Sequence, residues 1–320
     1  MKTSDDLKNF YDTLLYNDLK SLEAYRKNVV SRLVAALVII AVLAAIICFL
    51  LRRVEFVLFV LAAGFAAYTA VYYFCTKEYR SKFKSSIIEK IVKFTDPGLS
   101  YEKDNYLHEP QFVTSSLFLK TPDRYHGDDY VFGVIGKTRI EFSEIHAEYK
   151  TETRDSQGRR HTRWNTIFKG IFFRADFNKN FQGRTVVLPD TAERLFGNLG
   201  TSLQSWNIAR GQLIKLEDPD FEKVFVVYGD DQIESRYILS TSLMKRIREF
   251  KEKTGKNICV SFTGSSVFVA IPYSQDMFEP RIFKTLLDFS PILNYFENLE
   301  LVAGIVDDFN LNIRIWDKQA

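Results

Sequence analysis

Three ionisable side chains alternate along one predicted strand. Glu144, His146 and Glu148 occupy every second position, so in a strand their side chains share one face, about 6.5 to 7 Å apart. One histidine with two carboxylates could begin an oxygen-rich metal site or serve in acid/base chemistry. The plainer interpretation is a solvated polar face, because the sequence shows no second cluster of ligands. This set is the first candidate for chemistry in the chain.

A group of basic residues surrounds a predicted hairpin loop a little further along. The loop is Asp155-Ser156-Gln157-Gly158, in which glycine supplies the positive φ of a tight turn. The basic side chains could bind a phosphate, a nucleotide or a lipid surface through charge-assisted hydrogen bonds. The alternative is a solvated loop in which Glu152 and Asp155 partly balance the charge. The basic positions are Arg154, Arg159, Arg160, His161 and Arg163.

Familiar catalytic motifs are missing from the sequence. It has no Gly-Lys-Ser/Thr phosphate loop, no Gly-x-Ser-x-Gly, no His-Glu-x-x-His and no Cys-x-x-Cys. Four histidines and one cysteine outside the apolar runs leave little for a nucleophile with its base. We therefore expect no cofactor and no established catalytic set, although the lack of motifs does not exclude an enzyme.

The elements that must position these residues are strands. Alternating patterns cover 130–134, 139–153, 166–177 and 184–188, with turn residues between them. They predict a four-stranded antiparallel meander with one core face and one solvent face.

The remainder of the chain mixes helices and strands. Asp190 can cap a helix reaching Trp206, and 241–254 predicts a helix that Gly255 ends. Strands are expected at 223–228, at 236–239 and in a hairpin of 257–262 with 267–271, and 283–309 is mostly helical. Because the strands group in hairpins without regular βαβ alternation, the fold class is α+β.

Two uncharged apolar runs lie near the N-terminus. Leu33–Leu51 and Phe56–Cys75 contain 19 and 20 residues, which as helices reach ~28 and ~30 Å, enough to cross a bilayer core. They predict a transmembrane hairpin; a signal peptide fits less well because 32 mostly polar residues come first. Alanines recur at every fourth position, so we expect these stripes to face each other or a second copy of the chain. They are Ala41 and Ala45, then Ala62, Ala66 and Ala70.

The charges beside these runs predict the orientation. Nine Lys and Arg residues flank the hairpin on its outer sides, against Arg52 and Arg53 in the connecting loop. The positive-inside rule then places both termini in the cytoplasm. A lone Cys259 outside the runs fits that reducing compartment.

The net charge of +3 is unevenly distributed along the chain, and this distribution indicates which kinds of partner the protein can bind. Residues 1–95 carry 14 basic and 8 acidic side chains, whereas residues 96–320 carry 29 and 32. The positive charge beside the runs can meet anionic lipid, and an acidic remainder argues against a nucleic-acid partner. We expect the bilayer as partner, with self-association through the hairpin.

The boundaries follow from these patterns. We predict a cytoplasmic amphipathic helix at 1–32, the hairpin at 33–75, a stalk helix at 76–98, a β-meander subdomain at 99–210 and a second α+β subdomain at 211–320.

Several segments resemble an uncharacterised family of bacterial membrane proteins. They are 142–148, 164–170, 175–179, 183–190, 215–219 and 225–232. The resemblance implies two N-terminal spans in the bacterial inner membrane, a cytoplasmic domain, no known activity and a loose association with LemA-type membrane proteins. Together with the composition it favours a membrane-anchored interaction or scaffold module. The alternative is a membrane-tethered enzyme or a phosphate or metal sensor that uses Glu144, His146, Glu148 and the arginines at the hairpin tip.

Overall fold

The computed structural model describes residues 2–51, 56–177, 179–190 and 211–312. The chain divides into two compact units. The first comprises Met1–Ile91 with Phe278–Glu297, and the second comprises Val92–Met277 with Asn298–Ala320.

The first unit begins with a capped helix. Thr3 accepts a hydrogen bond from the backbone N–H of Asp6, and the Asp6 carboxylate accepts one from the backbone N–H of Thr3. This reciprocal capping box satisfies donors at the helix start. Helix α1 (Ser4–Phe10) continues through the π-helical turn η1 (Tyr11–Leu15) into α2 (Tyr16–Leu51). The predicted amphipathic helix that runs into the first apolar stretch is therefore confirmed.

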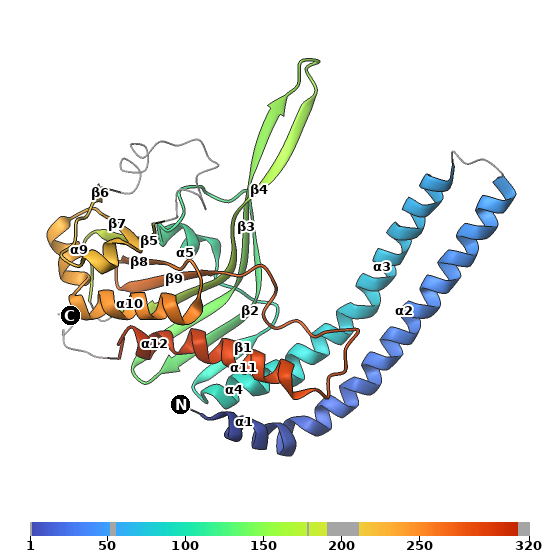
Figure 1. Ribbon diagram of the computed structural model, residues 1–320, viewed down its shortest axis with the longest axis horizontal. Helices are drawn as coiled ribbons and strands as arrows, with labels where there is room; N and C mark the ends of the chain where they lie inside the picture. Colours follow the sequence, from blue (N-terminus) through green and yellow to red (C-terminus); the bar gives the residue numbers. More distant parts are fainter. Residues whose placement is uncertain (1, 52–55, 178, 191–210, 313–320) are drawn as a thin grey trace. The chain divides into compact units, whose positions relative to one another are not determined.

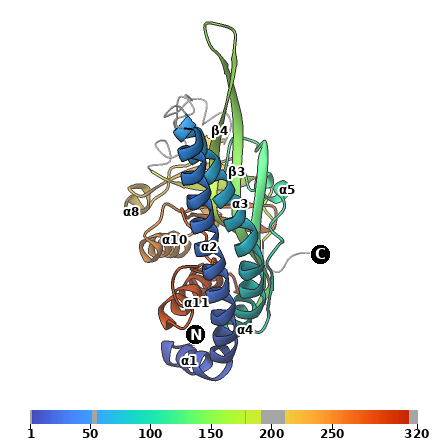
Figure 2. The same ribbon diagram turned by 90° about the vertical axis from the view of Figure 1, so that its right-hand side faces the viewer.

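The second apolar run forms helix α3. It spans Val57–Phe83 and continues through η3 (Lys84–Ile88) and α4 (Glu89–Thr95). The chain is therefore helical where the stalk is expected, and the stalk itself stays a prediction. Helices α2 and α3 lie side by side (Figures 1 and 2). Gly64 allows this close packing, because a Cβ at that position would lie 3.2 Å from Cγ2 of Ile40.

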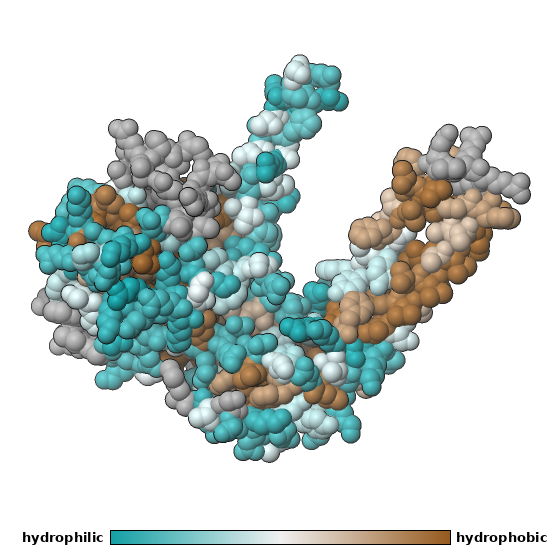
Figure 3. Space-filling view, in the orientation of Figure 1, coloured by the Kyte–Doolittle hydropathy of each residue, from teal (hydrophilic) through white to brown (hydrophobic). Residues whose placement is uncertain are grey.

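Apolar side chains cover the outside of these two helices. Leu43, Leu58 and Phe65 are among the large apolar residues that are more than half exposed. Figure 3 shows the hydrophobic surface gathered over both helices. Both are long and apolar enough to cross a membrane.

The alanine stripes do not lie between the two helices. The partly buried positions of α2 and α3 include Ala36, Ile40, Ala44, Gly64 and Tyr68. The predicted alanines instead belong to the exposed sides; these are Ala41, Ala45, Ala62, Ala66 and Ala70. The prediction that the stripes face each other within one chain is wrong, because each helix turns a different stripe inward. Contact with a second copy stays a prediction.

A late segment of the chain completes the first unit. Glu23 and Arg26 form a buried ion pair with an N–O distance of 2.7 Å. The Arg26 guanidinium donates to the carbonyl of Ile282 at 2.8 Å, and the backbone N–H of Leu286 donates to the Glu23 carboxylate at 3.0 Å. These bonds hold residues 278–297 against helix α2.

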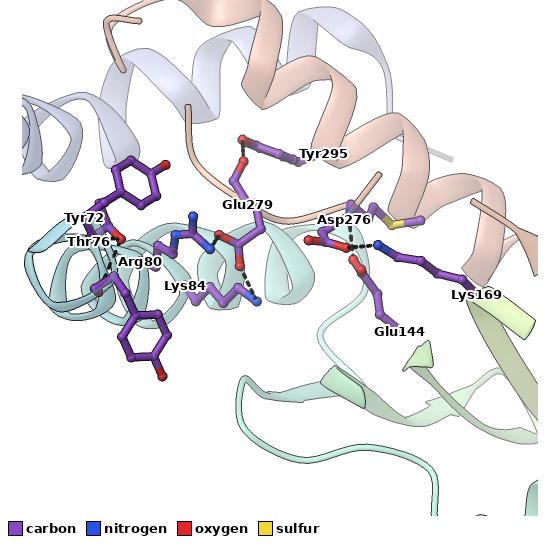
Figure 4. Close-up of polar contacts among 11 residues, drawn as sticks. Tyr72, Thr76, Arg80, Lys84, Glu144, Lys169, Asp276, Glu279 and Tyr295 are labelled. Atoms are coloured by element: carbon purple, nitrogen blue, oxygen red, sulfur yellow. Dashed lines mark hydrogen bonds and ion pairs between the residues drawn. The ribbon is translucent and has the colours of Figure 1, made fainter. Parts of the chain in front are cut away.

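A second ion-pair group joins the same segment to the third helix (Figure 4). Arg80 and Lys84 approach the Glu279 carboxylate at 3.3 and 3.1 Å. The hydroxyl of Tyr295 donates to the Glu279 carbonyl at 2.9 Å. The ion pairs thus fix the beginning of the segment, and the Tyr295 bond joins its two ends to each other.

Among the described residues, the second unit is built on one antiparallel sheet of nine strands. Its order is β1-β2-β3-β4-β9-β8-β5-β7-β6. The strands are β1 (Leu99–Glu102), β2 (Arg124–Ile135), β3 (Thr138–Arg154), β4 (Arg160–Asp176), β5 (Arg184–Pro189), β6 (Gln212–Leu213), β7 (Phe225–Gly229), β8 (Cys259–Thr263) and β9 (Ser266–Pro272).

The sheet confirms three strands of the predicted meander and corrects the fourth. Strands β2, β3 and β4 pair in sequence, but β5 pairs with β7 and β8. The β8–β9 hairpin lies between β4 and β5. Pairing between distant strands depends on long-range packing, which local patterns do not contain. Strands on both sides of residue 210 belong to this sheet, so the units follow a division other than the one predicted there.

Further helices follow along the chain. They are α5 (Glu109–Thr114), α8 (Pro219–Glu222), α9 (Gln232–Ile238), α10 (Thr241–Thr254), α11 (Phe289–Ala303) and α12 (Ile305–Asp308). Of these, α11 crosses from the first unit into the second. The extended piece expected at 236–239 is wrong, because Asp231 caps α9 by accepting from the N–H of Glu234. Gly255 ends α10 with a φ of +61° as predicted. The helix expected from Asp190 to Trp206 falls largely outside the described residues.

Both faces of the sheet carry buried side chains. On one face Phe112 of α5 packs against Phe172, with ring centroids 5.3 Å apart. On the other face Phe142, Phe173 and Val269 are fully buried. Core packing on both faces therefore holds the central strands of the sheet in place.

Candidate functional site

The predicted polar face of β3 meets a matching polar face on β2. Antiparallel pairing places His126 opposite His146, and Asp128 opposite Glu144. Side chains directly opposite each other on neighbouring strands are the closest cross-strand neighbours. The structure therefore adds partners from β2 to two of the three residues singled out from the sequence.

Histidines and a carboxylate gather at one end of this face. The rings of His126 and His146 lie edge to face with centroids 5.9 Å apart. Glu148 approaches Nε2 of His146 at 3.8 Å. One ligand atom from each of the three residues lies within 4.8 Å of the others. Two imidazoles with one carboxylate form a donor set that suits zinc or iron(II), with coordination positions left for water or a ligand.

A cluster of three carboxylates lies at the next pair of residues on this face of β2 and β3. Asp128, Asp129 and Glu144 also offer oxygens within 4.8 Å of one another. A bulge interrupts β2 between Asp128 and Val131, and Asp129 adopts a φ of +58°. Asp129 is fully buried and accepts a hydrogen bond from the Tyr101 hydroxyl. The bulge thus turns a buried carboxylate toward its neighbours.

A pocket of about 290 Å³ opens beside these residues. It is lined by residues 126–128 of β2, 144–146 of β3, 169–171 of β4, and 273 and 275–277 of the following loop. Strand β9 passes so close to β4 that position 170 requires glycine. A Cβ there would overlap the carbonyl of Ile271.

Two contacts fix the loop at the pocket (Figure 4). The backbone N–H of Met277 donates to Oε1 of Glu144 at 2.6 Å. Lys169 pairs with Asp276 at 3.2 Å. An ammonium group from β4 and a carboxylate from the loop therefore both line the pocket.

Two residues that line the pocket, Glu144 and His146, have shifted pKa values. Burial, together with the nearby carboxylates of Asp129 and Asp128, raises the pKa of Glu144 to about 9. Glu144 therefore holds a proton at neutral pH. Burial also lowers the pKa of His146, which keeps its imidazole neutral and able to coordinate a metal. Perturbed groups beside a pocket are typical of binding or catalytic sites.

The arginines of the second candidate lie elsewhere. Arg154, Arg159, Arg160 and Arg163 are exposed on the outer part of the β3–β4 hairpin, beyond the residues that line the pocket. Arg159 pairs with Asp155 at 3.0 Å, and Arg160 pairs with Glu152. The structure does not bring them to Glu144, His146 and Glu148.

The structure identifies site residues that the sequence argument missed. The sequence argument assigns no role to His126, Asp128 or Asp129. The available signal was the alternation of His126 with Asp128, which matches that of His146 with Glu144. Because β2 pairs with β3 around a bulge, the register could not be read from that alternation alone.

Comparison with known protein families gives one match, to the C-terminal region of the chain. Residues 166–311 match DUF3137, a protein family of unknown function. This confirms the expected uncharacterised family for that region and assigns no activity. The match includes Lys169, Asp276 and Met277 but begins after the histidines and Glu144. Comparison with curated proteins gives no match, and the LemA association stays a prediction.

A solved structure is also similar to the chain. It is the crystal structure of the mycobacterial trehalose monomycolate transport factor A, TtfA, with 9% sequence identity and a TM-score of 0.34. The match covers 67% of this chain and 96% of that one. At this TM-score the similarity carries no argument about function.

Proposed function

We propose that the protein is a membrane-anchored module whose sheet domain binds a divalent metal ion through His126, His146 and Glu148. The observation that carries the proposal is the meeting of two histidines from neighbouring strands with a carboxylate, beside a pocket. The site would act as a sensor or as the centre of a tethered enzyme. A scaffold role, also expected from the sequence, stays a prediction.

The anchor is supported by the exposed apolar surface of α2 and α3. A soluble protein rarely leaves so many large apolar side chains in water, and both helices reach the length of a bilayer core. The excess of Lys and Arg outside the hairpin supports cytoplasmic termini. The loop with Arg52 and Arg53 lies outside the described residues.

The metal site is supported by the kind and placement of its donors. Neutral imidazoles and a carboxylate suit zinc, iron(II) and related ions. The paired register of β2 and β3 holds both histidines on rigid strands, so binding requires little reorganisation.

The test is metal binding by the full-length protein in detergent. After treatment with a chelator, the protein is titrated with Zn²⁺, Mn²⁺ or Fe²⁺, and bound metal is measured by calorimetry and elemental analysis. We expect one tightly bound ion per chain, lost in His126→Ala and in His146→Ala. His161→Ala is the matched control, because that imidazole is exposed at the hairpin tip. Equal binding by the wild type and the His126→Ala/His146→Ala double variant would refute the site.

The anchor has a separate test. Alkaline washing of membranes should leave the protein in the pellet, and a reporter fused after Ala320 should be active only in the cytoplasm. Release by the wash would contradict membrane insertion, whereas a reporter active outside the cytoplasm would contradict the topology.

A further inference from the structure

The outer part of the β3–β4 hairpin, residues 149–165, is a two-stranded ribbon that projects from the sheet (Figures 1 and 2). Strand β2 pairs with β3 only as far as Glu148, and β9 pairs with β4 only from Gly170 onward. Beyond those points the two strands of the ribbon pair only with each other. An isolated two-stranded hairpin is at best marginally stable in water, so the ribbon gains little from the core of its own unit.

The ribbon is a positively charged extension of an acidic region. It carries five Lys and Arg residues against Glu152 and Asp155. The rest of residues 96–320 carries 24 basic and 30 acidic side chains. A separation of charge of this size creates a local field that attracts anions.

The two acidic side chains of the ribbon are already occupied. Asp155 accepts hydrogen bonds from the Arg159 side chain at 3.0 Å and from the backbone N–H of Gln157 at 2.9 Å. Glu152 pairs with Arg160 and with Lys150. Arg154 and Arg163 form no ion pair with any residue in the described ranges, so their charges are available to a partner.

The register places like charges opposite each other. Arg154 is the direct cross-strand partner of Arg160, an arrangement that destabilises a hairpin in isolation. Glu152 already pairs with Arg160, so an anion bound at Arg154 would offset the charge that remains. Guanidinium groups bind phosphate oxygens by paired charge-assisted hydrogen bonds.

We propose that the ribbon binds the anionic phospholipid surface of the membrane that holds the protein, by contacts of Arg154 and Arg163 with lipid phosphates. The proposal rests on the membrane anchoring proposed above. An anchored protein stays beside the bilayer, so anionic lipid is the anionic surface at the highest local concentration. The chemistry of the ribbon also suits anionic lipid, because basic segments are attracted to an anionic lipid surface without an apolar face. The metal site is independent of it.

The experiment uses the full-length protein in lipid nanodiscs. A dye is attached at Ser156→Cys, an exposed position in the loop, in a chain with Cys48, Cys75 and Cys259 replaced by alanine. Energy transfer to a headgroup-labelled lipid is compared between phosphatidylcholine discs and discs with about a third phosphatidylglycerol. Recovery of the protein with the neutral discs verifies the anchor, so the two proposals can fail separately.

We expect more energy transfer in the anionic discs, and its loss when salt is raised to about 0.5 M, because salt screens exposed charges. Arg154→Gln and Arg163→Gln should each lower the ratio of bound to free ribbon about fivefold. Arg154→Lys/Arg163→Lys should retain most of it, which separates loss of charge from misfolding of the ribbon.

Lys215→Gln/Lys245→Gln removes two exposed charges elsewhere on the same unit and is the matched control, expected to change nothing. Equal transfer in neutral and anionic discs, with the protein inserted in both, would overturn the proposal. Binding of the ribbon to an acidic protein, with no binding to anionic lipid, would also overturn it.

Discussion

His126 and His146 face each other across the β2–β3 pair, with ring centroids 5.9 Å apart and ring planes at 87°. Two imidazoles in this position, with Glu148 beside them, can share one ion. If they act as one site, their contributions to metal affinity must be strongly coupled.

The first prediction concerns that coupling. His126→Ala and His146→Ala should each weaken Zn²⁺ binding at least about 10- to 100-fold, and the double variant should be little worse than either single variant. Isothermal titration of the full-length protein in detergent measures the four affinities. Effects that simply add would indicate two separate, weak sites.

The second prediction concerns the buried carboxylate of Asp129. Tyr101→Phe removes the hydroxyl that donates to it and leaves a fully buried acceptor with one partner fewer. A loss of about 1–3 kcal/mol in the free energy of unfolding is expected. Thermal unfolding followed by near-ultraviolet circular dichroism should show it.

Tyr149→Phe is the control for that change. No hydrogen bond joins the Tyr149 hydroxyl to another residue of the described ranges, so its loss should leave the unfolding temperature within about 1 °C, corresponding to a small fraction of a kcal/mol. Equal effects of the two variants would contradict the role of the Tyr101 hydroxyl.

The third prediction concerns the buried pair Glu23–Arg26. Glu23→Ala leaves the Arg26 guanidinium without its carboxylate and should destabilise the first unit by about 3–5 kcal/mol. Asp12→Asn, which breaks the exposed pair Lys8–Asp12, should cost about 0.5 kcal/mol or less. A similar small shift of the melting temperature for both variants would show that the buried pair is not structural.

A fourth prediction follows from the pH dependence of the same pair. The hydrogen bond from Arg26 lowers the pKa of Glu23 in the folded chain. Because the folded pKa lies below the unfolded value of about 4.3, the contribution is fully present above that pH and is lost as the pH falls through the folded pKa. Acid unfolding of the wild type should therefore show a loss of stability below about pH 4 that Glu23→Gln lacks. Parallel acid profiles would refute it.

The fifth prediction concerns Gly170 at the pocket. A Cβ there would overlap the backbone of β9, so Gly170→Ala should separate β4 from β9 locally and destabilise the second unit by at least ~2 kcal/mol. Gly158→Ala has a φ of +78° but open space around it, and should cost only about 1 kcal/mol. Urea unfolding of both variants compares the two costs, and the reverse order would contradict the close approach.

The sequence was most informative where the signal was local. The capped N-terminal helix, the helices that contain the apolar runs and the α10 stop at Gly255 all follow from spacing and end residues. The alternation of Glu144, His146 and Glu148 also held as one face of a strand, because the strand period is two. These features depend on neighbours within a few positions.

By itself, the sequence determined the α+β class, the two long apolar helices and half of the candidate site. Only the tertiary structure decided that β9 lies beside β4, that His126 and Asp129 join the site, and that residues 278–297 fasten to the first helices. The reason is physical: helix and strand periods are set by nearby residues, whereas strand order, bulges and buried ion pairs are set by burial between segments far apart in the chain.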